Sequence, residues 1–305
     1  MATRNSMPKQ TRTGFRQTRD DTLFILSIVV PILLLFLVIR FIPIGEAFVD
    51  SFTKKSLIRP GTSFVGLANY KKILFDPVFH RAFWNTIEVA SLTMFLSVVF
   101  GLTLASVVNS AMIRGLKIFQ ALLFLPVIVS LVPATLMWKL LFDYNAGFLN
   151  YLLNVCGAKS VDWINDSTNI AFAIITVSVW KTMGYNMMIF IVGLKAIPAE
   201  YYEAASLDGA SRYAHFRHIT LPLLRPITLF IMVISVIMHV KIFTQAVVMS
   251  SGSQSSGEVF KTLVYYVYQS AFQHFDVGLS SAAAMALLVL VFGLTFLQLR
   301  ISKQD

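Results

Sequence analysis

The stretch PAEYYEAASLDGASRYAHFRHITLP, residues 198–222, is a long polar segment between two apolar runs in the second half of the chain. Pro198 can occupy the first position of a helix, where its missing N–H costs nothing, and Glu203 lies toward the positive end of that helix's dipole. Gly209 is suited to end the helix, and Ser211 is suited to cap a second one. The stretch therefore predicts a polar loop with two short helices joined at a glycine corner.

The composition of the chain places it in a membrane. Of its 305 residues, 56% are hydrophobic and only 13% are charged, whereas soluble domains are about 25% charged. Several charge-free runs can cross a hydrocarbon core of about 30 Å, which needs about 20 apolar residues per helix. Backbone polar groups in lipid must be satisfied internally, and the alternating short strands of a β-barrel are absent from the sequence, so the spans must be helices.

Six apolar runs predict six transmembrane helices, and therefore an all-α membrane protein with both ends on one side. Pro31, Pro126 and Pro133 lie inside these runs and should kink or locally unwind the helices. The expected organisation is a basic tail, a six-helix domain that contains the polar loop, and a short C-terminal end: residues 1–21, 22–300 and 301–305, with spans at about 22–43, 86–110, 118–142, 170–194, 226–249 and 277–299.

The distribution of Lys and Arg predicts the orientation of the spans. The segments that are cytoplasmic with the N-terminus inside carry more of these residues than the external loops do, which favours that orientation. Both termini and the loop 198–222 then face the cytoplasm, and the net charge of +10 suits an anionic leaflet. The apolar run Thr22–Ile39 lacks a small-residue cleavage site, so we expect it to be a retained first span and not a signal peptide.

Motifs for catalysis or metal binding are missing from the sequence. It contains no HExxH, no paired CxxC and no GxxxxGK[ST] phosphate loop, so it cannot bind ATP by that route. Cys156 is the single cysteine, so no internal disulfide is possible. We expect no catalytic residue, no metal and no cofactor on this chain, no nucleic-acid partner, and an energy source on another subunit.

The polar loop also carries a family resemblance. Glu203-Ala204-Ala205, then Gly209 after three residues and Ile219-x-Leu221-Pro222 after nine more, resembles the EAA signature of membrane subunits of binding-protein-dependent ABC importers. An ordinary solvated loop would explain the charge of this segment but not the spacing. The resemblance implies a type I ABC importer permease fold with six transmembrane helices and a cytoplasmic coupling helix. It also implies that an ATPase is coupled through five positions: Glu203, Ala204, Ala205, Asp208 and Gly209.

A second resemblance lies before the second span. The run Phe64-Val65-Gly66-Leu67-Ala68-Asn69-Tyr70, with Asp76, Phe79 and Asn85-Thr86 downstream, is similar to the sugar-importer branch of the family, that of maltose-type and glycerophosphate-type permeases. The residues themselves predict an amphipathic helix in the headgroup region. We expect its apolar face to hold Leu67, Tyr70, Ile73 and Leu74, and another face to hold Lys71 and Lys72. The family adds a binding protein that docks nearby.

Two lysines fall inside spans, where an unpaired charge costs about 2.5–3.5 kcal/mol. Lys181 shares a helical face with Tyr185, and Lys241 shares one with Gln245. These four residues predict a translocation pathway that donates hydrogen bonds to hydroxyl or anionic groups of a solute. The alternatives are snorkelling and pairing with a neighbouring subunit.

Other polar residues near the membrane are less specific. Lys139 and Arg40 lie at span ends and are expected to be interfacial anchors, whereas His239 suits packing and a pathway equally. The spans contain no Asp or Glu, apart from Glu88 at the edge of the second span. Proton- and sodium-coupled carriers usually hold carboxylates at membrane depth, so their absence from the spans argues against an ion-coupled secondary transporter.

The expected function is the pore-forming subunit of an ATP-driven importer in the bacterial inner membrane, for a carbohydrate or similar polar solute. The resemblance implies a second homologous permease, two cytoplasmic ATPases that hold ATP and Mg²⁺, and an extracytoplasmic solute-binding protein as partners, with lipid around the spans. An ion-coupled secondary transporter and an ABC permease for a non-sugar solute remain as alternatives. The identity of the solute does not follow from the sequence.

Overall fold

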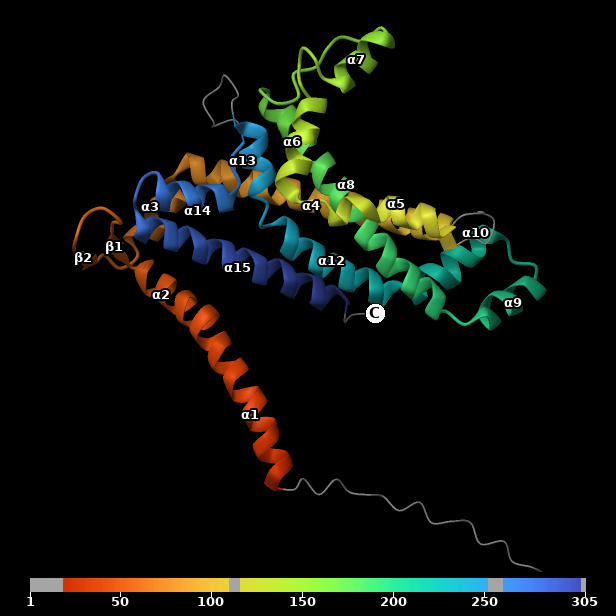
Figure 1. Cartoon of the computed structure of the whole chain (residues 1–305), viewed down its shortest axis with the longest axis horizontal. Coiled ribbons are helices and arrows are strands. Elements are labelled where there is room, and N and C mark those ends of the chain that lie inside the picture. The colour runs from red at the N-terminus through yellow and green to blue at the C-terminus, as the bar shows by residue number, and fades with distance from the viewer. Residues whose placement is uncertain (1–18, 110–115, 252–259, 303–305) are drawn as a thin grey trace, which may run out of the picture. The chain divides into compact units, whose positions relative to one another are not determined.

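A computed structural model describes residues 19–109, 116–251 and 260–302, so most of the basic tail expected at 1–21 lies outside the described residues (Figure 1). The chain forms two units, residues 1–49 and 50–305. The first unit contains α1 (Arg19–Phe36), a π-helix (Leu37–Phe41) and most of α2 (Ile42–Asp50). This stretch is long and apolar enough to cross a membrane. The helix α1 continues through Pro31, and the irregular turn follows six residues later.

The second unit begins with a small β-hairpin, which adds two short strands to the expected all-helical fold. β1 (Thr53–Lys55) pairs antiparallel with β2 (Thr62–Phe64), and Thr53 lies opposite Phe64. Threonine and phenylalanine favour extended backbone, and Gly61 takes a positive φ of 115° in the connecting turn. The amphipathic helix predicted after it is α3 (Ala68–Phe75). Its buried face consists of Asn69 and Ile73, while Leu67 and Leu74 are exposed, which corrects the expected apolar face.

Three continuous helices form the frame of the second unit: α4 (Pro77–Asn109), α8 (Ser167–Ala196) and α15 (Val277–Ser302). Each is long and apolar enough to span a membrane. The helices α4 and α8 pack against each other, and α12 (Arg225–His239) contacts both α4 and α15. Figure 1 shows α9 (Ala199–Leu207) and α10 (Arg212–His215) at one end of this unit, and the hairpin with α3 and α14 (Leu263–Phe272) at the opposite end. We call these the corner end and the hairpin end.

Two of the expected spans are broken in the structure. The run expected at 118–142 forms α5 (Leu116–Ile128) and α6 (Leu131–Leu141), whose axes differ by 100°. Pro126 lies inside α5, two residues before its end, and it lacks the N–H that would donate to the preceding turn, which weakens the last turn of the helix. The run expected at 226–249 forms α12 and α13 (Thr244–Ser250), separated by a non-helical segment. The break frees the carbonyl oxygen of Ile242, which accepts a hydrogen bond from the Thr262 hydroxyl at 2.8 Å.

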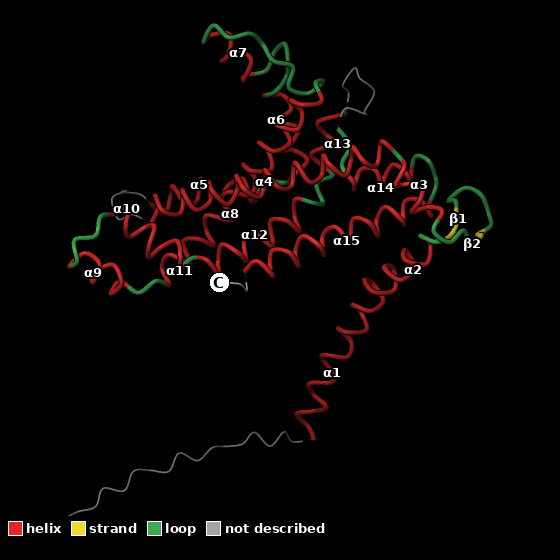
Figure 2. Tube along the Cα trace, turned by 180° about the vertical axis from the view of Figure 1, so that it is seen from behind, coloured by secondary structure: helices red, strands yellow, loops and turns green. Residues whose placement is uncertain are grey.

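The remaining short elements lie outside the continuous spans. The helix α7 (Phe148–Val155) follows α6, and a second π-helix (Phe216–Thr220) and α11 (Leu221–Leu223) connect α10 to α12. The segment from Arg212 to Leu223 meets α12 at 62°, so the described residues contain four continuous candidate spans, or six if each bent pair counts as one. Figure 2, seen from behind, shows the same helical composition, with loops confined to the connections.

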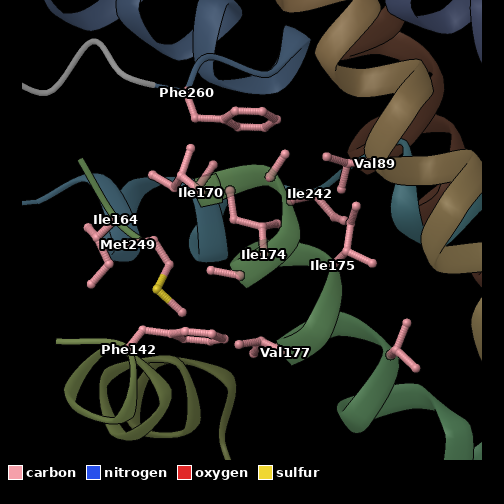
Figure 3. Packing of buried hydrophobic residues seen from close by; sticks show 14 residues of the cluster. Val89, Phe142, Ile164, Ile170, Ile174, Ile175, Val177, Ile242, Met249 and Phe260 are labelled. Carbon is pink, nitrogen blue, oxygen red and sulfur yellow. The ribbon is translucent and has the colours of Figure 1, made fainter. Parts of the chain in front are cut away.

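The largest apolar core lies around the first half of α8. Ile170, Ile174 and Val177 pack against Phe142 from the end of α6 and Met249 from α13 (Figure 3). All five side chains are fully buried. This core therefore fixes both broken helices, α6 and α13, against one continuous helix.

Close approach of α5 and α8 depends on a glycine. A Cβ atom at Gly184 would overlap the carbonyl oxygen of Leu123 on α5. Small residues are common where transmembrane helices meet, because van der Waals packing drives association when both helix faces and lipid are apolar. Gly184 therefore sets the distance between α8 and the first half of the broken span.

Candidate functional site

A pocket of about 370 Å³ lies between the two helix breaks, and we call it the polar pocket because seven of its eleven lining residues have polar side chains, although most of its lining surface is apolar. Its lining comes from Leu131 at the start of α6, from the middle of α8, and from the segment that joins α12 to α13. Three of the four pathway residues predicted from the sequence line it, namely Lys181, Lys241 and Gln245. The other lining residues are Ser178, Thr182, Met238, His239, Ile242, Phe243 and Thr244.

The positively charged ammonium group of Lys181 caps the C-terminal end of α5. Its Nζ donates hydrogen bonds to the carbonyl oxygens of Pro126 at 2.7 Å and Val127 at 3.1 Å, and also to that of Val129. The last carbonyls of a helix have no partner within the helix and carry the negative end of its dipole. The ammonium group of Lys181 therefore stabilises the broken span at the edge of the pocket.

Lys139 caps the other broken helix in the same way. Its Nζ donates to the carbonyl oxygen of Val248 at 2.9 Å and to the carbonyl and hydroxyl oxygens of Ser251, at the end of α13. The sequence predicts an interfacial anchor for Lys139, but the structure shows it bonded to protein backbone. The sequence could not predict this contact, because α6 and α13 are about a hundred residues apart along the chain.

Lys241 lies in the non-helical segment between α12 and α13, and its side chain is exposed. The expected helical face with Gln245 does not exist, because the break separates the two residues, yet both reach the same pocket. Within the part of the chain that the structure describes, Lys241 makes no hydrogen bond or ion pair. Gln245 is buried, and its Nε2 lies 3.4 Å from the hydroxyl of Ser178.

His239 is the most buried titratable group at the pocket, with 4% of its surface exposed. Its Nδ1 lies 2.6 Å from the carbonyl oxygen of Ser235. Since a carbonyl only accepts, Nδ1 carries the hydrogen, and in a neutral imidazole Nε2 is left as an acceptor. Nε2 has no partner among the described residues. Because Nε2 is itself buried, it does not face the open space of the pocket, and His239 contributes to the wall mainly by packing.

Tyr185, the fourth predicted pathway residue, lies one turn beyond Lys181 on α8 and is not among the residues that line the pocket. Sequence reasoning missed Ser178 and Thr182, which line the wall on either side of Lys181. The available signal was their spacing, since they are three residues before and one residue after the lysine in an otherwise apolar span. No Asp or Glu is among the lining residues of this pocket.

The polar corner predicted at 198–222 is present at the corner end. The helix α9 ends at Leu207, and Gly209 follows with a positive φ of 77°, so the predicted glycine corner is present. The N–H of Ala210 donates to the carbonyl oxygen of Ala205 at 2.9 Å, as at a glycine-terminated helix. The hydroxyl of Ser211 accepts from the N–H of Ala214 at 3.3 Å, so the predicted cap of the second helix is also observed.

The predicted coupling residues are on the surface of this corner. Glu203, Ala204, Asp208 and Gly209 are exposed, and Ala205 is half-buried. Neither carboxylate forms an ion pair with another described residue. The hydroxyl of Tyr202 lies 3.0 Å from that of Thr220, and this pair holds α9 against the π-helix that precedes α11. The corner is therefore fixed from its inner side while its outer side stays open to a partner.

The second sequence motif joins elements at the hairpin end. Asp76 accepts a hydrogen bond from the hydroxyl of Tyr266 on α14 at 2.6 Å. Burial and this neighbouring carboxylate raise the pKa of the Tyr266 hydroxyl, because both disfavour the phenolate. Asn69 donates to the carbonyl oxygens of Ser51 and Thr53, at 2.9 and 2.8 Å. The motif therefore stabilises the packing of α3 and α14 with the hairpin.

Comparison with known proteins then decides the family. The family described as "Binding-protein-dependent transport system inner membrane component" matches residues 97–304. The chain belongs to this family. The match includes the pocket and the corner, and the membrane location and transport role expected from the sequence are confirmed.

Relatives and solved structures of this permease agree with the assignment. The arabinooligosaccharides transport system permease protein AraP of Bacillus subtilis (strain 168) is 34% identical over 274 residues, 89% of this chain and 86% of that protein. The sn-glycerol-3-phosphate transport system permease protein UgpA of Yersinia pestis bv. Antiqua (strain Antiqua) is 31% identical, over 85% of this chain and 86% of that protein.

The fold of the permease also matches a solved transporter. The crystal structure of a bacterial alginate ABC transporter, in complex with its alginate pentasaccharide-bound periplasmic protein, matches with a TM-score of 0.81 at 19% identity. The match covers 93% of this chain and 96% of that chain. The ABC importer permease fold expected from the sequence is thereby confirmed.

Proposed function

We propose that the chain is the pore-forming permease of an ATP-driven importer for a carbohydrate or similar polar solute, which a binding protein delivers. The names of its relatives support this substrate class, since AraP is named for arabinooligosaccharides and UgpA for sn-glycerol-3-phosphate. The observation that carries the proposal is the pairing of an exposed corner at one end of the unit with a polar pocket between the helix breaks.

The proposed complex contains a second, homologous permease, two cytoplasmic ATPases that bind ATP and Mg²⁺, and an extracytoplasmic solute-binding protein. The corner end and the end of α15 lie on the same side of the unit (Figure 1), as expected if the coupling loop and the C-terminus are both cytoplasmic. The excess of Lys and Arg in the corresponding loops supports this orientation. The hairpin end then faces the binding protein.

The proposed mechanism is a two-state change driven from the corner. When ATP closes the ATPase dimer, the corners of the two permeases move with it, through Glu203, Ala204, Ala205, Asp208 and Gly209. The continuous helices α4, α8 and α15 rock as rigid bodies, and the pocket opens toward the binding protein. Solute enters and contacts Lys241 and Gln245, and hydrolysis reverses the motion. Lys181 holds the end of α5 in place at the edge of this pathway.

Cross-linking tests the coupling surface directly. Leu207 is 90% exposed at the end of α9, so a Leu207→Cys variant in a Cys156→Ser background presents one thiol at the corner. We expect a short bifunctional reagent to join it to the ATPase in membranes from cells that express the whole system. The matched control is Leu74→Cys, which is 63% exposed at the hairpin end and should not be joined to the ATPase. Cross-linking of the ATPase from position 74 but not from position 207 would contradict the proposal.

Reconstitution tests the energy source. The purified chain alone in liposomes should move no solute, with or without an ion gradient. The full complex with its binding protein should move solute when ATP is present on the ATPase side. Uptake by the isolated chain under a proton or sodium gradient would contradict the proposed dependence on ATP.

A further inference from the structure

The charges at the polar pocket are unbalanced. Its lining includes two lysines, Lys181 and Lys241, but no carboxylate. Lys181 is already satisfied by three carbonyl oxygens at the end of α5. Lys241 makes no such contact within the described residues. Its side chain is exposed at the pocket, so its ammonium group is available to bind a negative group of a solute.

The hydrogen-bonding groups of the pocket also favour a negatively charged ligand. An ammonium group offers three donors and no acceptor. The amide nitrogen of Gln245 lies within hydrogen-bonding distance of Ser178, so one of the neutral polar groups at the wall is already engaged. A site for a neutral sugar would be expected to present carboxylates or free amides to its many hydroxyls, whereas this pocket presents a free cation.

We propose that the pocket selects a solute with an anionic group, a sugar carboxylate or phosphate, and that Lys241 is the residue that binds this group. This inference rests on the proposed function of the pocket as part of the solute pathway, and it narrows the solute from polar sugars to acidic ones.

Direct binding to the assembled complex in nanodiscs tests the charge preference without the binding protein. Two matched pairs of probes are used: galacturonate with galactose, and glucose 6-phosphate with glucose. Each pair differs in the acidic group, so a preference for the acid in one pair identifies carboxylate or phosphate. Saturation-transfer NMR and calorimetry measure binding. We expect at least one acidic probe to bind tenfold or more tightly than its neutral partner, with a gain of about 1.4 kcal/mol.

Variants assign that preference to one side chain. Lys241→Gln should remove most of the preference for the acidic probe, and Lys241→Arg should retain it. The matched control is Lys54→Gln, which removes the same charge from a separate basic pocket at the hairpin end. The control should leave the preference unchanged. Loss of the preference in the control but not in Lys241→Gln would assign anion binding to the hairpin end and overturn the inference.

The remaining outcomes separate the inference from the function on which it rests. Equal binding of acidic and neutral probes overturns the charge selection and leaves the importer proposal intact. If Lys241 instead pairs with a carboxylate of the second permease, Lys241→Gln will lower the recovery of the complex without changing the preference, which also overturns the inference. Failure of an intact, ATP-hydrolysing complex to bind any of the four probes contradicts the pocket as a solute site, and the inference falls with it.

Discussion

Lys181 donates a hydrogen bond from Nζ to the carbonyl oxygen of Pro126 at 2.7 Å, and so joins the middle of α8 to the end of the broken helix α5. The carbonyl groups at the end of α5 lie next to the polar pocket. They have no hydrogen-bond partners within the helix itself. Lys181 therefore has a positioning role, since it fixes the helix break that shapes one wall of the pocket.

Removal of this cap should destabilise the α5–α6 break. We expect Lys181→Met to lower the stability of the protein in detergent by about 1–2 kcal/mol, the range of hydrogen bonds between transmembrane helices. Lys181→Arg should retain most of the stability, because a guanidinium group can also donate to several carbonyls. Thermal unfolding followed by fluorescence size-exclusion measures both variants. Equal stability of Lys181→Met and wild type would contradict the capping role.

Gly209 lies at the proposed coupling corner, and Gly157 provides a matched control for a substitution there. Both take a positive φ, 77° and 79°, and a Cβ at either position would meet no atom within 4 Å. Aspartate at either position therefore meets the same backbone strain, but only position 209 lies on the proposed contact with the ATPase. We expect Gly209→Asp to abolish ATP-driven uptake while the protein remains in the membrane.

The control variant distinguishes the effect of backbone strain from the loss of the proposed contact with the ATPase. Gly157→Asp should be produced at the same level as Gly209→Asp and should transport normally. Uptake assays and membrane fractionation give both readouts. Normal uptake by Gly209→Asp would remove this residue from the coupling surface.

The contact between Tyr266 and Asp76 should stabilise the hairpin end. We expect Tyr266→Phe to cost about 2 kcal/mol, because a hydrogen bond to a carboxylate is lost from a buried position. Tyr268→Phe is the control, since the Tyr268 hydroxyl has no hydrogen bond among the described residues. In thermal unfolding, Tyr268→Phe should have the same unfolding temperature as wild type. A loss of stability in Tyr268→Phe equal to that in Tyr266→Phe would assign the effect to the rings and not to the hydroxyl.

The raised pKa of Tyr266 gives this contact a pH dependence. A group whose pKa is raised on folding contributes its full stability below its unfolded pKa, which is about 10 for tyrosine. The contribution is lost as the pH rises through the folded value. The stability difference between wild type and Tyr266→Phe should therefore be constant from pH 6 to pH 9, as unfolding measured across that range would show.

Packing at Gly184 should tolerate no side chain. A methyl group there would overlap the carbonyl oxygen of Leu123, and backbone cannot move aside as a flexible side chain can. We expect Gly184→Ala to destabilise the protein by about 1–3 kcal/mol, the usual cost of overpacking. Gly293→Ala in α15 is the control, because a Cβ there meets nothing within 4 Å. If Gly184→Ala and Gly293→Ala unfold at the same temperature, α5 and α8 do not approach as closely as described.

The linear sequence was sufficient for the class of protein and for the corner. Apolar runs dictate helices in lipid because no water is present to satisfy the backbone, and this holds whatever the tertiary packing. The corner was readable because glycine termination and serine capping are local interactions, complete within a few residues of Gly209 and Ser211. The roles of Glu203 and Asp208 toward an ATPase remain predictions.

Only the tertiary structure decided how the membrane-depth residues are arranged. The sequence separates Lys139, at the end of an apolar run, from Lys181 and Lys241, inside two others. In the structure Lys139 and Lys181 both cap helix ends, and Lys241 lines the pocket without a partner among the described residues. The difference arises because the last carbonyls of α5 and α13 have no partners within their own helices and are satisfied by lysines distant in the chain. Helix breaks of this kind depend on contacts between separate segments, and a linear pattern of hydrophobicity contains no record of those contacts.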